Sequence, residues 1–308
     1  MAVAALGLLT GCDGSEDESA TAGSAGEAGE GGALVWALDS APRDVDPLHA
    51  RSPSEALVSR QVHEPLAASV GAPFDEARLV PGLAISVLPT EGGRVWRVRL
   101  REGVRFQDGG SFDTRAVLAN ARRWQESSIA RRLLGDFLVD APKPGLVRFI
   151  LPAPDPGFAE RLGSARLGIL SPRALRRVAS LGSLPARATS TGTGPFEIRE
   201  RGGGRLLLAR NTEWWGTDRR LGPAIDQIEF RIVPGAAAER VAMLSDGTAQ
   251  VASGIGAAQR ARIRRDPLLT VIPGAGGLAA ERSVRGISAA DGRAPLLNEL
   301  WRTAIAPG

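Results

Sequence analysis

Strand-like and helix-like segments alternate along the chain from residue 33 to about residue 250. The continuous apolar run ALVWAL at residues 33–38 has the length of a buried strand. Residues 94–101, RVWRVRLR, alternate large apolar side chains with arginines, the period of two that is typical of a half-buried antiparallel strand. We also expect a short strand at residues 104–106 that pairs back on residues 94–101, strands at residues 146–151 and 225–233, and a hairpin at residues 195–210 around a Gly-Gly-Gly turn.

Helices are predicted between these strands. Ser52-Pro53-Ser54-Glu55 has the pattern of a capping box with proline at the first helical position, which predicts a helix from there to about Leu66. Asp113 is a suitable N-cap for a helix over residues 114–124, because apolar side chains recur on one face of it. Further helices are expected at residues 172–181 and 236–244. This alternation indicates a mixed α/β architecture.

The first eleven residues, MAVAALGLLTG, form an apolar run with the length of a signal-peptide core. The run is too short to cross a bilayer as a helix, which takes about 20 residues. The only cysteine, Cys12, follows in the string Leu9-Thr10-Gly11-Cys12, which resembles the lipobox of bacterial lipoproteins. The resemblance implies cleavage before Cys12 and a diacylglycerol on its thiol. The alternative is an incidental or buried cysteine after a frayed apolar start.

Residues 12–32 differ in character from everything that follows. Residues 1–32 contain six acidic side chains and no lysine or arginine, and residues 13–32 are rich in Gly, Ser and Ala. A segment with no large apolar side chain to bury is predicted to be a flexible, solvated, acidic tether. An anchor and a tether together would place the folded part outside the cytoplasmic membrane, on the cell surface or in the periplasm.

The remaining residues are strongly basic. The whole chain carries a formal net charge of +4, so residues 33–308 carry +10. Lys143 is the only lysine and there is no tyrosine, so the excess of arginine, spread evenly, resembles a coding bias as much as a binding surface. We expect no nucleic-acid partner, because an exported, tethered protein would seldom meet one.

Signatures of catalysis are missing from the sequence. The two histidines, His49 and His63, stand in no metal-binding spacing, and the GxSxG, GxxxxGK[ST] and GxGxxG patterns are absent. A structural or surface role for each histidine is the preferred interpretation. We therefore expect a binding protein with no enzymatic activity, no cofactor and no metal site.

One string carries a resemblance to a known family. Residues 100–109, LREGVRFQDG, resemble the "L-R-x-G-V-x-F-x-D-G" signature of the family 5 bacterial solute-binding proteins. Five further landmarks follow the family order: DPLH at 46–49, EPL at 64–66, VPGLA at 80–84, TGTGPF at 191–196 and RN with WWG at 210–216. The resemblance implies a periplasmic-binding-protein-like α/β fold (type II, cluster C) with mixed sheets, and service to an ABC importer of oligopeptides, dipeptides, nickel complexes or related solutes.

The resemblance also implies a division into domains. We expect a lipoprotein signal peptide at residues 1–11, the tether at 12–32, and solute-binding lobes at 33–250, the first lobe with an inserted subdomain at about 52–180. Family members are longer, so the fold is expected to be incomplete at the C-terminus. Residues 251–308 are then the start of a third lobe or a divergent terminus, and the stretch LLNELWRTAIA at 296–306 leaves both possibilities open.

Four residues are candidates for ligand binding. Asp39 and Ser40 end the first predicted strand, where the family places backbone and acidic contacts to ligand and where α/β proteins favour binding sites. Trp214 and Trp215 could line the cleft. The alternatives are a solvated loop for the first pair and a core position for the second.

The expected function is that of an extracytoplasmic lipoprotein that binds a small solute, with a peptide as the first choice, and delivers it to an ABC permease. The expected partners are therefore a small-molecule or peptide ligand, the permease, and the membrane through the lipid anchor. The alternative is a binding-protein lobe without a competent cleft that acts as an interaction or scaffold module.

Overall fold

A computed structural model describes residues 32–70, 78–186, 191–217, 225–235, 237–274 and 277–282. The predicted anchor at Cys12, residues 12–31 of the predicted tether and the stretch at 296–306 lie outside the described residues.

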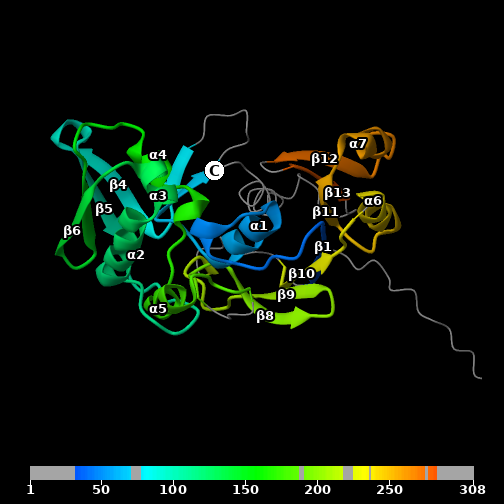
Figure 1. Ribbon diagram of the computed structural model, residues 1–308, viewed down its shortest axis with the longest axis horizontal. Helices are drawn as coiled ribbons and strands as arrows, with labels where there is room; N and C mark the ends of the chain where they lie inside the picture. The colour runs from blue at the N-terminus through cyan, green and yellow to red at the C-terminus, as the bar shows by residue number, and fades with distance from the viewer. Residues whose placement is uncertain are drawn as a thin grey trace, which may run out of the picture.

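A large mixed sheet forms one end of the molecule (Figure 1). Its strand order is β12-β13-β11-β1-β10-β9-β8. The central strand β1 is parallel to both of its neighbours, β10 and β11, and the other pairs are antiparallel. The bounds are β1 (Ala33–Leu38), β8 (Phe196–Gly202), β9 (Arg205–Arg210), β10 (Gln227–Ile232), β11 (Val251–Ile255), β12 (Leu269–Gly274) and β13 (Gly277–Arg282).

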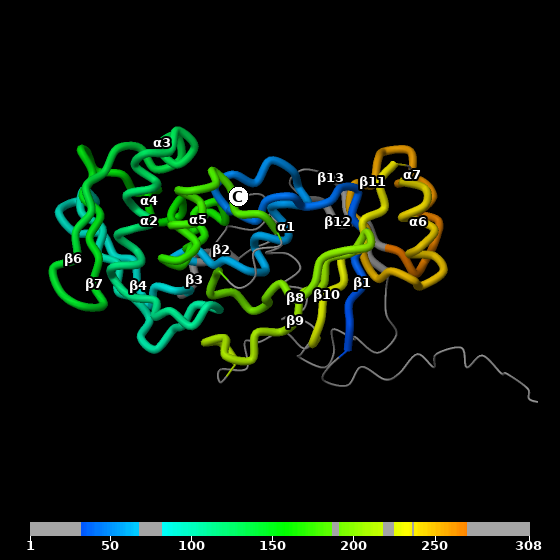
Figure 2. Tube along the Cα trace, turned by 60° about the horizontal axis from the view of Figure 1, so that its bottom comes forward, coloured from blue at the N-terminus to red at the C-terminus, as the bar shows by residue number. Residues whose placement is uncertain are grey.

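A smaller antiparallel sheet with the order β4-β5-β7-β6 lies at the opposite end, as both views show (Figures 1 and 2). Its strands are β4 (Ala84–Thr90), β5 (Val95–Leu100), β6 (Leu138–Lys143) and β7 (Leu146–Ile150). A separate pair, β2 (Ala67–Val70) and β3 (Arg78–Pro81), precedes it in the chain.

Seven α-helices are described: α1 (Pro53–Val62), α2 (Thr114–Glu126), α3 (Ser128–Leu134), α4 (Phe158–Leu162), α5 (Pro172–Leu181), α6 (Ala237–Asp246) and α7 (Ala257–Ile263). Short 3₁₀ turns lie at η1 (Pro47–His49), η2 (Glu91–Gly93) and η3 (Ala165–Leu167). Within the described residues, no helix combines the length and apolar character needed to cross a membrane.

Both faces of the large sheet are covered. Leu34, Trp36 and Leu38 of β1 share a core with α1 and α5, whereas Ala37 packs on the other face with α6 and α7. Burial on both faces explains why β1 is a continuous apolar run with no polar alternation. The smaller sheet has its own core, in which its inner face packs against α2, α3 and α4.

Most predicted elements are confirmed. β1 has the predicted bounds, and Ser52 and Glu55 form the capping box of α1. Helix α1 nevertheless ends at Val62, four residues before the predicted end, because His63 adopts an extended backbone (φ −119°, ψ 136°).

The predicted pairing of residues 104–106 with residues 94–101 is wrong. Strand β5 already has a partner on each edge, β4 and β7, so no edge is left for a third strand. Residues 104–106 instead form a tight local turn, in which Phe112 N donates to Val104 O at 3.0 Å and Arg105 bridges to Ser111.

The expected division into domains stays a prediction, and the packing of the elements near its boundaries is as follows. α1 and α5 lie within the expected subdomain at 52–180, but they pack against the large sheet, and the separate core contains residues between 48 and 169. Near residue 250 the large sheet is continuous, because β11, β12 and β13 all pair within it.

Candidate functional site

The carboxyl ends of three parallel strands meet at one edge of the large sheet. β1 lies between β10 and β11 with all three pointing the same way, so the loops that follow them lie together. Loops at this position are the usual place for ligand contacts in open α/β sheets. The loop after β1 contains Asp39 and Ser40, both half-buried, and it leads toward the start of α1.

Hydroxyl groups hold one oxygen of the Asp39 carboxylate. Ser54 Oγ, in the first turn of α1, donates to Asp39 Oδ1 at 3.0 Å. Ser40 Oγ lies 3.2 Å from the same oxygen and 3.1 Å from Ser54 Oγ. The other oxygen, Oδ2, lies against Gly254 of β11: a Cβ on Gly254 would be 2.6 Å from it, and the φ of Gly254 is +67°. Only glycine permits this close approach at this backbone conformation.

A buried arginine joins the ends of β10 and β11. Arg240 of α6 is 2% exposed, and its guanidinium donates to four main-chain carbonyl oxygens. The distances are 2.9 Å to Ser253 O, 2.9 Å to Gly254 O, 2.7 Å to Val233 O and 3.3 Å to Gly235 O. Trp36 Nε1 adds a hydrogen bond to Ser253 Oγ at 2.8 Å. These bonds fix the strand ends that flank Asp39.

The arrangement is suited to binding. An ionised carboxylate accepts hydrogen bonds and donates none, so Asp39 suits an ammonium or amide N–H group on a solute. Its orientation is fixed in advance by Ser40 and Ser54, which lowers the cost of ordering it in a complex. In the described part of the chain, no group of three or more His, Cys, Asp or Glu side chains converges in a way that could hold a metal ion.

The two tryptophans lie elsewhere, beyond the C-terminal end of α1. Trp215 Nε1 donates to Glu64 Oε2 at 3.0 Å and to Oε1 at 3.2 Å, and the Arg101 guanidinium lies 4.0 Å from the centre of a Trp215 ring. Trp214 is buried, with its ring 5.0 Å from that of Trp215. Burial raises the pKa of Glu64 to about 7, although the hydrogen bonds from Trp215 Nε1 and the charge of Arg101 oppose the shift.

The four candidate residues therefore form two separate groups. Asp39 and Ser40 contact the first turn of α1, and Trp214 and Trp215 gather around Glu64 beyond its last turn. A ten-residue helix is about 15 Å long. Three further residues build the first group and were not predicted from the sequence: Ser54, Gly254 and Arg240. A glycine within a strand is a recognisable sign of close backbone approach, and it could have indicated Gly254.

The TGTGPF segment fits tightly against the end of α1. A Cβ on Gly192 would lie 1.9 Å from Val62 O, and one on Gly194 would lie 2.5 Å from Gln61 O. Gly194 N donates to Val62 O at 2.9 Å. His63 Nε2 hydrogen-bonds Thr191 Oγ1 at 3.0 Å, and burial lowers the pKa of His63 to about 4. The glycines and the neutral histidine therefore serve packing at this position.

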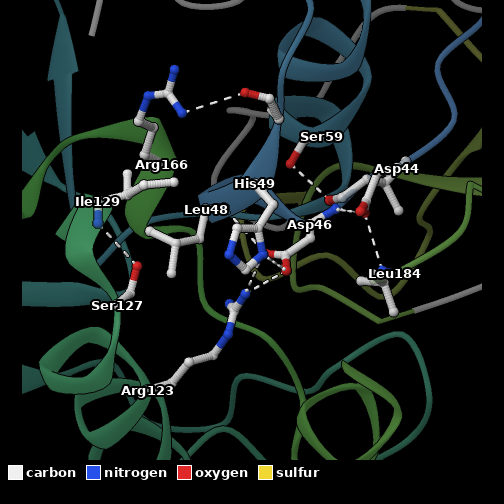
Figure 3. A network of polar contacts seen from close by, with 12 residues as sticks. Asp44, Asp46, Leu48, His49, Ser59, Arg123, Ser127, Ile129, Arg166 and Leu184 are labelled. Atoms are coloured by element: carbon white, nitrogen blue, oxygen red, sulfur yellow. Dashed lines mark hydrogen bonds and ion pairs between the residues drawn. The ribbon is translucent and has the colours of Figure 1, made fainter. Parts of the chain in front are cut away.

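The DPLH segment has a structural role of the same kind (Figure 3). Asp46 is fully buried, and its Oδ2 accepts hydrogen bonds from Arg123 of α2 and interacts with His49 Nδ1 at 2.9 Å. Its Oδ1 accepts from Leu48 N at 3.1 Å. Asp44 Oδ1 accepts from Asp46 N at 2.8 Å and from Leu184 N at 3.1 Å. The network ties η1 to α2 and thus links the two ends of the molecule.

Comparisons with known proteins find a matching family and related sequences. The family described as bacterial extracellular solute-binding proteins, family 5 middle, matches residues 78–307. The nickel-binding periplasmic protein of Escherichia coli K12 is 26% identical over 212 residues, which cover 65% of this chain and 38% of that protein. The glutathione-binding protein GsiB of the same strain is 30% identical over 183 residues, covering 58% of this chain and 34% of that protein.

Solved structures share the fold. The periplasmic binding protein AgaA of A. tumefaciens R10, in complex with agropinic acid, aligns with a TM-score of 0.68 at 20% identity, covering 78% of this chain and 48% of that one. DppA of Helicobacter pylori, in complex with the peptide STSA, aligns with a TM-score of 0.64 at 20% identity, covering 80% of this chain and 51% of that one. The chain thus spans less than two-fifths of these curated relatives and about half of these solved chains.

Proposed function

Because the chain belongs to the bacterial extracellular solute-binding proteins of family 5, we propose that it acts in the capture of a small solute outside the cytoplasm and its delivery to an ABC importer. Its α/β fold is that of the periplasmic binding proteins. The observation that carries the proposal is the fixed carboxylate of Asp39 at the meeting point of three parallel strand ends.

The solute that we propose carries an amino or amide group, and a peptide is the first choice. Asp39 would accept a hydrogen bond from that group through Oδ2, while Ser40 and Ser54 hold Oδ1. The relatives include proteins named for nickel and for glutathione, and solved neighbours carry a peptide or agropinic acid. Glutathione and peptides contain the N–H groups that this site suits.

In this proposal Trp214 and Trp215 support the junction between the two cores, and they are not the first contacts of the solute. Trp215 is already occupied by Glu64 and Arg101, and Trp214 is 8% exposed. A solute would have to displace these contacts in order to reach the rings.

We also propose that Cys12 carries a lipid that anchors the protein to the outer face of the cytoplasmic membrane. The support is the apolar run before Cys12 and the acidic, small-residue segment after it. The test is fractionation of cells that express the wild-type chain or its Cys12→Ser variant. The wild type should sediment with membranes and Cys12→Ser should be released; a variant that stays with the membranes contradicts the anchor.

Solute capture is tested by calorimetric titration of the full chain carrying Cys12→Ser with dipeptides, tripeptides, glutathione and a nickel salt. We expect saturable binding of a peptide or glutathione. Asp39→Asn should weaken it by about 10-fold to 100-fold, the usual effect of losing a hydrogen bond to a charged group.

Asp140→Asn is the matched control, because Asp140 pairs with Arg148 on the small sheet, far from the strand ends. It should bind as the parent does. No heat of binding with any solute at millimolar concentration would favour the alternative, a lobe that serves as an interaction module.

A further inference from the structure

Helix α5 (Pro172–Leu181) carries a group of positive charges. Its ten residues include Arg173, Arg176 and Arg177, all exposed, and no acidic residue. Among the residues that the structure describes, none of the three arginines forms an ion pair with a carboxylate. The opposite face of the helix is apolar, with Ala174 and Val178 buried in the core against the large sheet.

This concentration works against the stability of the helix itself. Arg173 and Arg176 are three residues apart, and Arg173 and Arg177 are four apart, so their side chains are neighbours on the helix surface and repel each other. Arg173 also lies in the first turn, where the helix dipole disfavours a positive charge. Helix stability therefore does not explain the three arginines, and an anionic surface that neutralises them would relieve the repulsion.

Contacts with α2 hold α5 in place, and the last residue of α5 is an exposed leucine. Helix α2 (Thr114–Glu126) packs against α5 (Figure 2). Asn120 of α2 exchanges hydrogen bonds with the backbone of Leu170, at 2.9 and 3.0 Å, which holds the start of α5 against α2. Leu181, at the end of α5, has 60% of its surface exposed, although it is a large apolar residue. An exposed leucine beside arginines places an apolar group, which can enter the interfacial layer, next to positive charges that attract anionic headgroups.

We propose that this basic face, made of Arg173, Arg176, Arg177 and Leu181, docks on the anionic phospholipid surface of the membrane. The inference rests on the proposed anchor for its location, because a lipid on Cys12 would keep the folded part close to the headgroups. Guanidinium groups bind phosphates in a bidentate way, which suits phosphatidylglycerol. Leu181 would enter the interfacial layer.

The experiment measures binding of the full chain carrying Cys12→Ser to vesicles by co-sedimentation. Vesicles of phosphatidylglycerol mixed with phosphatidylcholine are compared with vesicles of phosphatidylcholine alone. The test variant replaces Arg173, Arg176 and Arg177 with glutamine. The matched control replaces Arg97, Arg99 and Arg201 with glutamine. These arginines are also exposed and form no ion pair with a carboxylate of the described residues, and their replacement removes the same charge.

We expect the parent and the control to bind the phosphatidylglycerol vesicles more tightly than pure phosphatidylcholine. Each arginine near an anionic surface changes partitioning by a factor of about five, so the α5 variant should lose affinity on the order of a hundredfold. Equal losses in both variants would show an effect of net charge alone and overturn the proposal. Unchanged binding of the α5 variant, or no preference for phosphatidylglycerol, would also overturn it.

Two further measurements keep the outcomes separate. Thermal unfolding followed by circular dichroism should show that all variants remain folded, since every replaced side chain is exposed. Calorimetric titration with the solute should give the same affinity for the α5 variant as for the parent. If the α5 variant loses vesicle binding but still binds the solute, the effect belongs to the docking face alone. If the parent itself binds no solute, the result counts against the proposed function and not against the docking face.

Discussion

Trp215 Nε1 donates a hydrogen bond to Glu64 Oε2 at 3.0 Å, and this contact joins the segment after β9 to the segment after α1. Arg101, at the end of β5, lies over the Trp215 ring and donates through Nε to Gly82 O at 3.0 Å. The tryptophan also packs against the core of the smaller sheet. The cluster therefore connects the two cores through one buried carboxyl group.

Glu64→Gln should remove a pH dependence of stability. Burial raises the pKa of Glu64 in the folded state to about 7, above its ordinary value of 4.5. The folded state then holds the proton more tightly than the unfolded state, so the wild type loses stability as the pH rises from about 4.5 through 7. The loss is at most about 3 kcal/mol. Urea unfolding at several pH values measures it.

Glu102→Gln is the control for this series, because Glu102 is exposed and adjacent to Arg101. Its free energy of unfolding should change with pH with the same slope as that of the wild type. The stability of Glu64→Gln relative to the wild type should be greater at pH 8 than at pH 5. Parallel profiles for Glu64→Gln and the wild type would contradict the assignment of the slope to this carboxyl group.

Gly192→Ala should be strongly destabilising. A Cβ at this position would lie 1.9 Å from Val62 O, which is backbone and cannot move without shifting the end of α1. We expect a loss of at least about 3 kcal/mol, above the usual range for overpacking. Gly202→Ala is the control, since nothing lies within 4 Å of its Cβ position. Equal urea midpoints for the two variants would refute the packing argument.

Arg240→Met should destabilise the edge that carries Asp39. Methionine fills much of the volume but leaves the partly buried carbonyls of Val233, Ser253 and Gly254 without their donor, at up to about 1–3 kcal/mol for each carbonyl that water does not reach. Arg260→Met, on the exposed face of α7, should change stability by less than about 0.5 kcal/mol. The measurement is thermal unfolding, and a similar melting temperature for both variants would show that Arg240 does not hold the strand ends.

Local signals in the sequence identified much of the fold. The capping box at Ser52 and Glu55, the N-cap at Asp113 and the apolar run of β1 each act within a few residues, and each is present in the structure. Strand pairing depends on distant residues, and for that reason the pairing of residues 104–106 was wrong. For the same reason, the sequence did not indicate that β11 pairs with β1, because more than two hundred residues separate the two strands in the chain.

The candidate site was predictable only in part. The position of Asp39 and Ser40 at the end of the first strand follows from the apolar pattern of β1. The partners of Asp39 did not follow, because Ser54, Gly254 and Arg240 come from three other elements whose packing is set by the topology of the sheet. The separation of the tryptophans from Asp39 depends in the same way on the orientation of α1.

The most direct test of the account is a map of backbone amide chemical shifts during titration with the solute that binds most tightly in calorimetry. The account predicts the largest shifts at Asp39, Ser40, Ser54 and Gly254, and smaller ones at Trp214 and Trp215. Shifts concentrated around the two tryptophans, with the strand ends unchanged, would contradict it.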